Sequence, residues 1–206
     1  MYQEGEQNYP NCTVYKMHLW YPSKIKDCYR VTPFNVTDSR GAFCKPYSRD
    51  NFIHPLGTRW DDKQFPVPFI AREVYYSYSR KDVLRGLHIQ KNTAKLVTCQ
   101  KGYIQDVVVD LRANSPTYME WCDFFLHQNE SVFVPEGCAH GFKTCTSSIV
   151  LYVCSDMYDQ KYDTGIRYDD PDIGIEWSWP NSKVIISSRD KQLPYFKDWR
   201  KSYDAL

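Results

Sequence analysis

The sequence has no C-x-x-C pair, although it contains eight cysteines. Cysteines at that spacing are the usual sign of a structural zinc site, so a zinc site of that kind is not predicted. The five histidines likewise include no H-x-H pair. Because catalytic metal sites gather histidines and carboxylates around the ion, we expect no metal and no other cofactor in this chain.

Neither sign of charge dominates: 26 lysines and arginines stand against 25 aspartates and glutamates, for a formal net charge of +1. Without a basic excess or a basic run, no nucleic-acid partner is expected. The chain also lacks an apolar run of about 18 residues, the length that a membrane-spanning helix needs. Residues 1–10 are polar and form no secretion signal. We therefore predict a cytoplasmic protein with no membrane partner and with reduced cysteines.

Aromatic residues, in contrast, make up 16% of the chain and include 17 tyrosines. From residue 74 onward, short runs rich in β-branched and aromatic residues alternate with Gly and Pro turns. The predicted strands are 95–99, 103–111, 117–126, 131–134, 139–144 and 149–154, with turns at 101–102 and 135–137. Short strands at this spacing are typical of an all-β sandwich or barrel. Helical periodicity is visible only in the last 20 residues.

The beginning of the chain is organised differently. Residues 1–30 are polar and aromatic with weak periodicity, and we predict that they form an N-terminal extension, either an edge strand or a partner-binding arm. A single domain is predicted over residues 31–206. Within it, residues 38–41 predict a turn. Residues 55–68 contain three prolines, two adjacent aspartates and a glycine, which predict a loop.

A series of short motifs makes the sequence more specific. In chain order they are V-L-R-G-L-H (83–88), A-K-L-V (94–97), Q-D-V-V-V-D-L-R (105–112), S-P-T (115–117), V-P-E-G-C-A-H-G-F (134–142), L-Y (151–152), D-D-P (169–171), I-G-I-E-W (173–177) and S-S-R-D (187–190). This series closely resembles the dTDP-4-dehydrorhamnose 3,5-epimerase family over roughly residues 32–195. The resemblance implies a cupin-type jelly roll (a double-stranded β-helix) with a short C-terminal helical segment. It also implies a metal-free isomerase acting on a nucleotide-linked 4-keto-6-deoxy sugar.

The implied reaction inverts C3, C5 or both through an enolate. The C–H bonds beside a ketone are acidic, because the carbanion delocalises onto the ketone oxygen. Inversion needs a base on one face of the carbon, an acid on the other and a donor at the developing oxyanion. By resemblance, His88 is the base and Asp190 orients it, Tyr152 is the acid, and Lys95 faces the 4-keto oxygen. Imidazole and phenol suit these roles, since their reference pKa values are near ~6.5 and ~10.

The resemblance further implies substrate contacts. Guanidinium forks suit phosphate oxygens, and the expected binding residues are Arg40, Arg85, His140, Tyr158 and Arg189. Asp106 matches an interior carboxylate, which we expect to position Lys95 or His88. Members of the family are typically dimers that share an N-terminal strand, so a homodimer is predicted.

Two segments depart from the family pattern. The usual R-G-x-F-x-E-x-Y motif here runs from Arg40 to Tyr47 and carries Lys45 at its acidic position. The usual Q-x-N-x-S run here begins with Glu73 and carries Tyr75 in place of Asn. Both segments help to bind the nucleotide base in the family. The substrate nucleotide is therefore expected to be dTDP or GDP, and similar epimerases act on GDP-linked 4-keto-6-deoxy-heptoses in capsule pathways.

Other functions stay open at this point. A 3,4-ketoisomerase on the same fold also moves protons beside a ketone, and a non-catalytic cupin could bind a sugar nucleotide without reacting with it. The set of His88, Tyr152 and Asp190 favours the epimerase.

Overall fold

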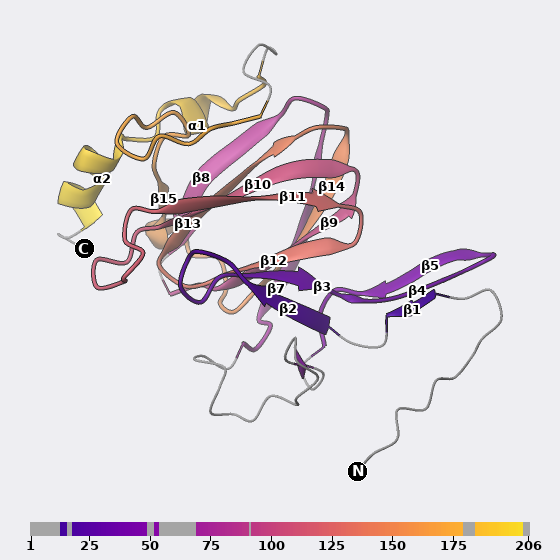
Figure 1. Cartoon of the computed structure of the whole chain (residues 1–206). Helices are drawn as coiled ribbons and strands as arrows, with labels where there is room; N and C mark the ends of the chain where they lie inside the picture. Colours follow the sequence, from indigo (N-terminus) through magenta and orange to yellow (C-terminus); the bar gives the residue numbers. More distant parts are fainter. Residues whose placement is uncertain are drawn as a thin grey trace.

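The computed structural model describes residues 13–15, 18–48, 52–53, 69–90, 92–178 and 184–203. Two large sheets dominate it (Figure 1), and their strands pair antiparallel except for one parallel pair at an edge of the second sheet. The five-stranded sheet has the order β11-β10-β13-β8-β15, formed by β8 (Leu84–Gln90), β10 (Tyr103–Asp110), β11 (Trp121–His127), β13 (Cys138–Thr144) and β15 (Asp163–Gly165). This arrangement is the predicted all-β jelly roll of the cupin type.

The second sheet has seven strands in the order β6-β2-β3-β12-β9-β14-β7. They are β2 (His18–Pro22), β3 (Tyr29–Thr32), β6 (Phe52–Ile53), β7 (Glu73–Ser79), β9 (Lys95–Lys101), β12 (Glu130–Val134) and β14 (Ser148–Cys154). The division predicted between residues 30 and 31 stays a prediction, but it falls within β3, and β2 pairs with β3 in this sheet. The predicted loop over residues 55–68 lies outside the described residues.

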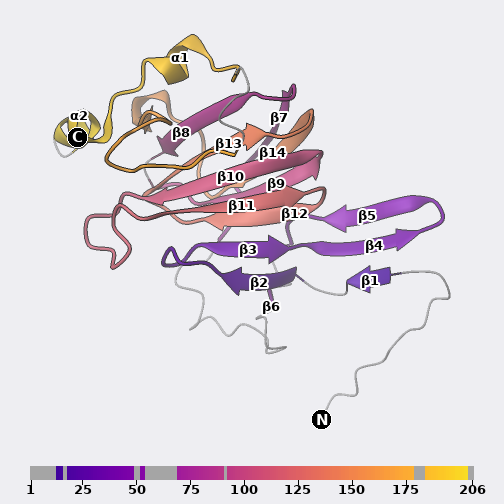
Figure 2. The ribbon, with the colours of Figure 1, turned by 45° about the horizontal axis from the view of Figure 1, so that its top comes forward.

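A third, three-stranded sheet has the order β1-β4-β5 and comprises β1 (Thr13–Tyr15), β4 (Phe34–Asp38) and β5 (Gly41–Lys45). It extends away from the two large sheets (Figures 1 and 2). The turn predicted at residues 38–41 joins β4 to β5, and Gly41 adopts a φ of 126° there, which a side chain would disfavour.

Short helices follow the strands. The 3₁₀ turn η1 (Gln160–Tyr162) precedes β15, while α1 (Ser188–Lys191) and α2 (Phe196–Tyr203) close the chain beside the five-stranded sheet (Figure 1). The helical periodicity of the last 20 residues therefore corresponds to α2. No helix among the described residues has the length and apolar character that crossing a membrane requires.

The core has three layers, which explains why the central strands are apolar on both faces. Between the two large sheets lies a cluster that includes Val97, Val108 and Phe142. The outer face of the five-stranded sheet packs against Phe196 and Trp199 of α2. The outer face of the seven-stranded sheet forms a further cluster that includes Trp20, Leu96 and Val153. The central strands of each large sheet are thus covered on both sides, and β13 is buried along its whole length.

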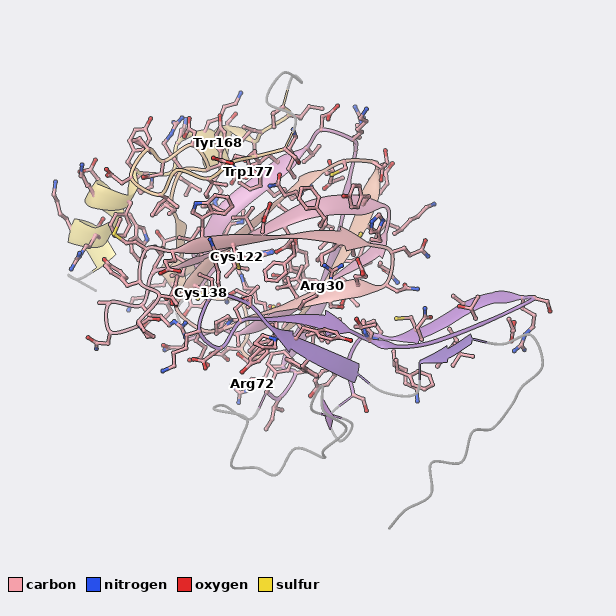
Figure 3. All side chains as sticks on the ribbon, viewed as in Figure 1. Arg30, Arg72, Cys122, Cys138, Tyr168 and Trp177 are labelled. Carbon is pink, nitrogen blue, oxygen red and sulfur yellow. The ribbon has the colours of Figure 1, made fainter. Side chains whose placement is uncertain are left out.

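The side chains fill the space between and around the sheets (Figure 3). Trp177, for example, donates from its indole nitrogen to the carbonyl of Tyr168 over 2.9 Å. The cysteines of the described residues are free thiols: Cys28, Cys44, Cys99, Cys122, Cys138, Cys145 and Cys154. Five of them are buried, as expected for small apolar residues in a core.

One predicted strand was wrong at its start. Residues 117–120 belong to the turn between β10 and β11, and the strand begins only at Trp121. Asp110 causes the difference, because its carboxylate accepts hydrogen bonds from Thr117 Oγ1 at 2.6 Å and Ser115 Oγ at 2.5 Å. These bonds hold the segment in a turn that the pattern of residue types does not reveal.

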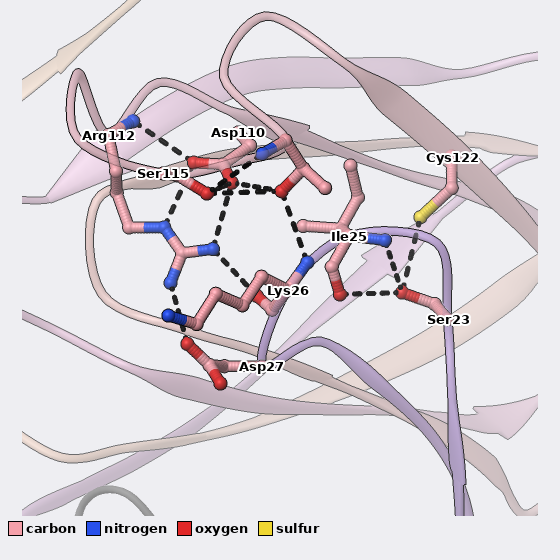
Figure 4. A network of polar contacts seen from close by, with 9 residues as sticks. Ser23, Ile25, Lys26, Asp27, Asp110, Arg112, Ser115 and Cys122 are labelled. Carbon is pink, nitrogen blue, oxygen red and sulfur yellow. Dashed lines mark hydrogen bonds and ion pairs between the residues drawn. The ribbon is translucent and has the colours of Figure 1, made fainter.

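The same carboxylate anchors a wider network (Figure 4). Arg112 donates from Nε and Nη2 to Asp110 over 2.9 and 2.8 Å, and from Nη2 to the carbonyl of Lys26 over 2.6 Å. Its Nη1 lies 3.2 Å from Asp27. The network therefore ties the turn after β10 to the loop between β2 and β3.

Replacing Asp110 with Asn should lower the free energy of unfolding by about 2 kcal/mol at neutral pH. Burial raises the pKa of Asp110, but the hydrogen bonds from Arg112, Ser115 and Thr117 outweigh it and hold the pKa at about 2. A depressed carboxyl pKa stabilises the fold above the unfolded value near ~3.9, and this stabilisation disappears as pH falls through the folded value. Urea unfolding of both proteins between pH 7 and pH 2 should therefore converge at the acidic end. Asp198→Asn, at an exposed position of α2, is the control and should change stability by less than about 0.5 kcal/mol. A difference between the wild type and Asp110→Asn that stays constant across pH would contradict the prediction.

Candidate active site

His88 lies on the inner face of β8, because its neighbours Leu87 and Ile89 pack into the cluster on the outer face. Its Nε2 is 2.8 Å from Oδ1 of Asp190, which lies on α1. Asp190 Oδ2 also accepts the backbone N–H of Gly86 over 3.2 Å. The side chain of His88 is 29% exposed and that of Asp190 only 5%. The carboxylate is thus fixed from two directions, while the imidazole stays accessible.

The electrostatics of this pair suit a base. Burial raises the pKa of Asp190, but the hydrogen bond and charge of His88, together with the Gly86 N–H, lower it below its usual value overall. Asp190 is therefore an anion at neutral pH. An anion at one ring nitrogen stabilises the imidazolium that forms when the other nitrogen takes a proton.

Glycines bring this strand close to its neighbour. Gly86 has a φ of 121°, and a Cβ at this position would lie 2.7 Å from Cα of Gly141 and 2.9 Å from the carbonyl oxygen of His140. The register between β8 and β13 shifts at this point. The R-G-L-H motif therefore needs its glycine to place His88 directly opposite His140.

Tyr152 and Lys95 lie on the opposite sheet. Leu96 and Val153 pack on the outer face of the seven-stranded sheet, so alternation directs Lys95 and Tyr152 to the inner face. Both are buried, at 9% and 8% exposure. Burial raises the pKa of the Tyr152 phenol, which keeps its proton at neutral pH. Burial lowers the pKa of the Lys95 ammonium.

Asp106 differs from its predicted contacts. We expected it to position Lys95 or His88, but its Oδ2 lies 2.8 Å from Nε2 of His140 on the adjacent strand. Both residues are buried, and Oδ1 of Asp106 has no hydrogen-bond partner among the described residues. Burial raises the pKa of Asp106, although His140 opposes the shift. The His140 ring meets Tyr152 edge-on, with centroids 6.3 Å apart, so His140 lies beside the candidate acid within the core.

A connected set of polar side chains lies at the edge of the site, and we call it the rim. Asp163 of β15 accepts from Arg189 over 2.7 Å and from the Tyr158 hydroxyl over 3.0 Å. Glu73 accepts the backbone N–H of Tyr158 over 3.0 Å. The charges of Asp163 and Glu73 both act on buried Lys95. Three predicted binding residues, Tyr158, Arg189 and Glu73, therefore belong to one connected rim.

Arg85 lies at another part of the same strand as His88. Its Nε donates to Ser79 Oγ over 3.0 Å and its Nη2 to the carbonyl of Tyr78 over 3.4 Å, and its positive charge acts on Tyr152. Arg85 is exposed, so its remaining donors are available to an anionic ligand.

Arg40 and Lys45 lie elsewhere, on the sheet that extends away from the two large sheets (Figure 2). Arg40 pairs with Asp38 at 2.6 Å, and Lys45 lies over the ring of Phe34 at 5.4 Å. This sheet has an open hollow of about 550 Å³, lined by Phe34, Val36, Asp38, Arg40, Gly41, Ala42, Phe43 and Lys45. Within this chain the two cations are thus separate from the His88 cluster.

Sequence reasoning missed two neighbours of the candidate acid. Tyr75 stacks on Tyr152, with centroids 4.8 Å apart, and Cys154 contacts the Tyr75 hydroxyl. A strand register would have revealed both, since Tyr75 and Tyr152 are cross-strand partners. Asp163 was also missed, because a short polar strand carries no periodic signal. Within the described residues, no group of three or more His, Cys, Asp or Glu side chains could hold a metal ion.

Comparison with known proteins places this geometry in context. The profile of the family described as dTDP-4-dehydrorhamnose 3,5-epimerase matches residues 22–198. The dTDP-4-dehydrorhamnose 3,5-epimerase of Methanothermobacter thermautotrophicus is 40% identical over 167 residues, which cover 78% of this chain and 85% of that protein.

Solved structures of similar proteins are also epimerases. NovW, a 4-keto-6-deoxy sugar epimerase from the novobiocin gene cluster of Streptomyces spheroides, is 30% identical with a TM-score of 0.79, covering 90% of this chain and 91% of its own. A dTDP-4-dehydrorhamnose 3,5-epimerase of Bacillus anthracis, solved with TDP and PPi bound, is also 30% identical, with a TM-score of 0.72 and coverage of 90% and 99%. These similarities favour epimerisation over the ketoisomerase and non-catalytic alternatives.

Proposed function

Because this chain belongs to the dTDP-4-dehydrorhamnose 3,5-epimerase family, we propose that it is an isomerase that inverts C3, C5 or both in a nucleotide-linked 4-keto-6-deoxy sugar. One observation carries the proposal. An accessible imidazole held by a buried carboxylate, at 2.8 Å, projects from one sheet. A buried phenol and a buried ammonium project from the other sheet. A sugar between the sheets would meet a base on one face and an acid on the other.

The chemistry follows from these positions. His88 takes the proton beside the ketone, and the C–H electron pair moves into the enolate, with charge developing on O4. The buried ammonium of Lys95 stabilises that charge. Tyr152 then donates its proton to the opposite face of the carbon, which inverts it. Solvent returns a proton to the phenolate and removes one from the imidazolium, so the net change is isomerisation alone.

The proposal is tested by solvent deuterium incorporation, followed by NMR. The protein is incubated in D₂O with dTDP-linked and GDP-linked 4-keto-6-deoxy sugars. Deuterium should appear at C3, C5 or both, together with inverted product, and the position of the label tells which carbons react. Binding of these nucleotide sugars without any incorporation would contradict catalysis and support the non-catalytic alternative.

The nucleotide is a separate question, and we infer that its base is guanine rather than thymine. Positions that depart from the family pattern already have partners in this chain. Glu73 accepts from Tyr158, Tyr75 stacks on Tyr152, and Lys45 lies over Phe34. Lys45 and Tyr75 also stand where the family pattern has an acidic residue and an asparagine, so these positions offer a base different donors and acceptors from those that suit thymine.

Calorimetric titration with dTDP and GDP should therefore show tighter binding of GDP, by about tenfold or more, because each well-placed hydrogen bond contributes on the order of 1 kcal/mol. UDP is the control for the shared diphosphate and should bind more weakly than GDP. A clear preference for dTDP would contradict the assignment of guanine without affecting the epimerase proposal.

We also infer a homodimer, in which the sheet of β1, β4 and β5 docks on a second copy. Phe43 on β5 is 58% exposed beside the open hollow, and burying such a side chain is worth roughly 1.5–3 kcal/mol. Light scattering at micromolar concentration should give twice the chain mass, and Phe43→Asp should shift the protein toward monomer. A monomeric wild type would contradict the inference.

The cytoplasmic location stays a prediction.

A further inference from the structure

Tyr75 has an unusual place beside the candidate acid. It lies on β7, directly opposite Tyr152 of β14 in the antiparallel register. Directly opposed residues of an antiparallel pair point to the same face of the sheet. The two rings are stacked, with centroids 4.8 Å apart and an angle of 20° between their planes. A second phenol therefore covers one face of the Tyr152 ring.

The Tyr75 hydroxyl is also anchored. Cys154 Sγ lies 3.8 Å from it, and Cys154 is the register partner of Lys95 on the next strand. Tyr75 thus bridges the candidate acid and the strand position of the candidate oxyanion donor. The residue is 40% exposed, and among the described strands β7 pairs with β14 alone. Tyr75 is accordingly the outermost side chain of this row, with Tyr152 on its inner side.

Two aromatic rings therefore contact the Tyr152 ring. His140 meets it edge-on from the other sheet, at 6.3 Å, and Tyr75 lies flat against it from the edge strand. His140 is itself held by Asp106. Without Tyr75, the face of the Tyr152 ring that points toward β7 would lose its only stacking partner among the described residues.

We propose that Tyr75 is a positioning residue: it holds Tyr152 in line with the second face of the substrate carbon and so sets how often proton removal ends in inversion. This inference rests on the proposed epimerase function. The enolate has two outcomes. A proton returned by His88 restores the original configuration, whereas a proton from Tyr152 inverts the carbon. In D₂O the first outcome gives exchange without inversion once the imidazolium has exchanged its proton for a deuteron from solvent, and the second gives exchange with inversion.

The ratio of exchange to inversion therefore reports on the position of the acid. Displacing a reacting group by about 1 Å can cost on the order of 10²-fold in rate, and a ring that has lost one restraint moves less than that on average. Removal of the Tyr75 ring should raise the ratio of exchange to inversion about tenfold. Loss of the hydroxyl alone leaves the stack in place and should change the ratio by less than about twofold.

The experiment measures initial rates of deuterium incorporation and of inverted product for the wild type, Tyr75→Phe, Tyr75→Leu and Tyr75→Ala, with one 4-keto sugar nucleotide. Tyr152→Phe gives the upper limit of the ratio. Tyr76→Ala is the matched control, because Tyr76 is the neighbouring β7 residue, is 69% exposed and points to the other face. Its ratio should equal that of the wild type.

The possible outcomes distinguish a failure of the proposed epimerase function from a failure of the positioning role of Tyr75. A wild type that neither exchanges nor inverts refutes the epimerase function itself. A wild type that does both, with Tyr75→Leu and Tyr75→Ala at an unchanged ratio, refutes the positioning role, even where both rates fall together through lost stability. Tyr75→Leu keeps most of the buried volume and so provides the answer if Tyr75→Ala does not fold. Restoration of the wild-type ratio in Tyr75→Phe supports the stack as the cause.

Discussion

Replacing His88 with Ala should reduce deuterium incorporation at the reacting carbons by about 10²–10⁴-fold, the usual contribution of a positioned general base. The imidazole is the accessible member of the 2.8 Å pair with Asp190, and no other side chain of the described residues occupies its place on β8. Exchange and inversion should fall together, because both begin with the same proton removal. NMR in D₂O measures both rates in one sample.

His127 offers a matched control. It lies on β11, outside the inner cluster, where its ring stacks on Tyr103 at 4.3 Å. His127→Ala removes the same imidazole and should leave both rates within about twofold of the wild type. Exchange by His88→Ala within tenfold of the wild type would mean that another group removes the proton, and the assignment of the base would then be wrong.

The sequence was sufficient for much of the central fold. The short runs rich in β-branched and aromatic residues, with their Gly and Pro turns, identified β9, β10, β12, β13 and β14, because each run has the length and the boundaries of a short strand. It was less informative about residues 18–32, whose strands are short and whose Trp20 is completely buried. Their place at one side of the seven-stranded sheet depends on long-range pairing of β3 with β12, and no local pattern encodes such a pairing.

The candidate site likewise divides into residues that the sequence indicated and contacts that it did not. The resemblance to a family suggested His88, Tyr152, Asp190 and Lys95, but spacing alone could not have brought together four residues from separate elements. The structure adds the pairing register between strands, which a local stretch of sequence does not determine. It pairs Asp106 with His140 and sets Tyr75 against Tyr152. Both contacts lie across strands, where neighbours in space are distant in the chain.

Replacing Lys95 with Met should lower kcat by roughly 10²–10³-fold, which corresponds to about 2.7–4 kcal/mol of lost stabilisation at the enolate oxygen. Lys95 is 9% exposed, and its ammonium has no hydrogen bond or ion pair among the described residues. Stability should not fall with the rate, since replacing a desolvated charge by an apolar side chain of similar length is neutral or favourable. Steady-state kinetics and thermal unfolding of the same preparation measure the two effects.

Lys143 provides a control with the opposite pattern. It is also buried, on β13, but its ammonium donates to the carbonyl of Ser178 over 2.6 Å, away from the inner cluster. Lys143→Met leaves that carbonyl without this donor and should cost about 1–3 kcal/mol of stability, while kcat changes little. A Lys95 variant that loses stability but keeps kcat would show that Lys95 is only structural.

The pH dependence separates electrostatic stabilisation from packing. Burial lowers the pKa of Lys95 below the ordinary lysine value of 10.5. As pH rises through this lowered value, the ammonium loses its proton and kcat should fall, at a lower pH than an exposed lysine would cause. The phenol of Tyr152 has a raised pKa, so it stays protonated over the same interval and does not explain the decline. Lys95→Met should therefore have a low kcat that no longer declines on this alkaline side. If the decline persists in Lys95→Met, the titrating group is another residue, and the oxyanion role of Lys95 is refuted.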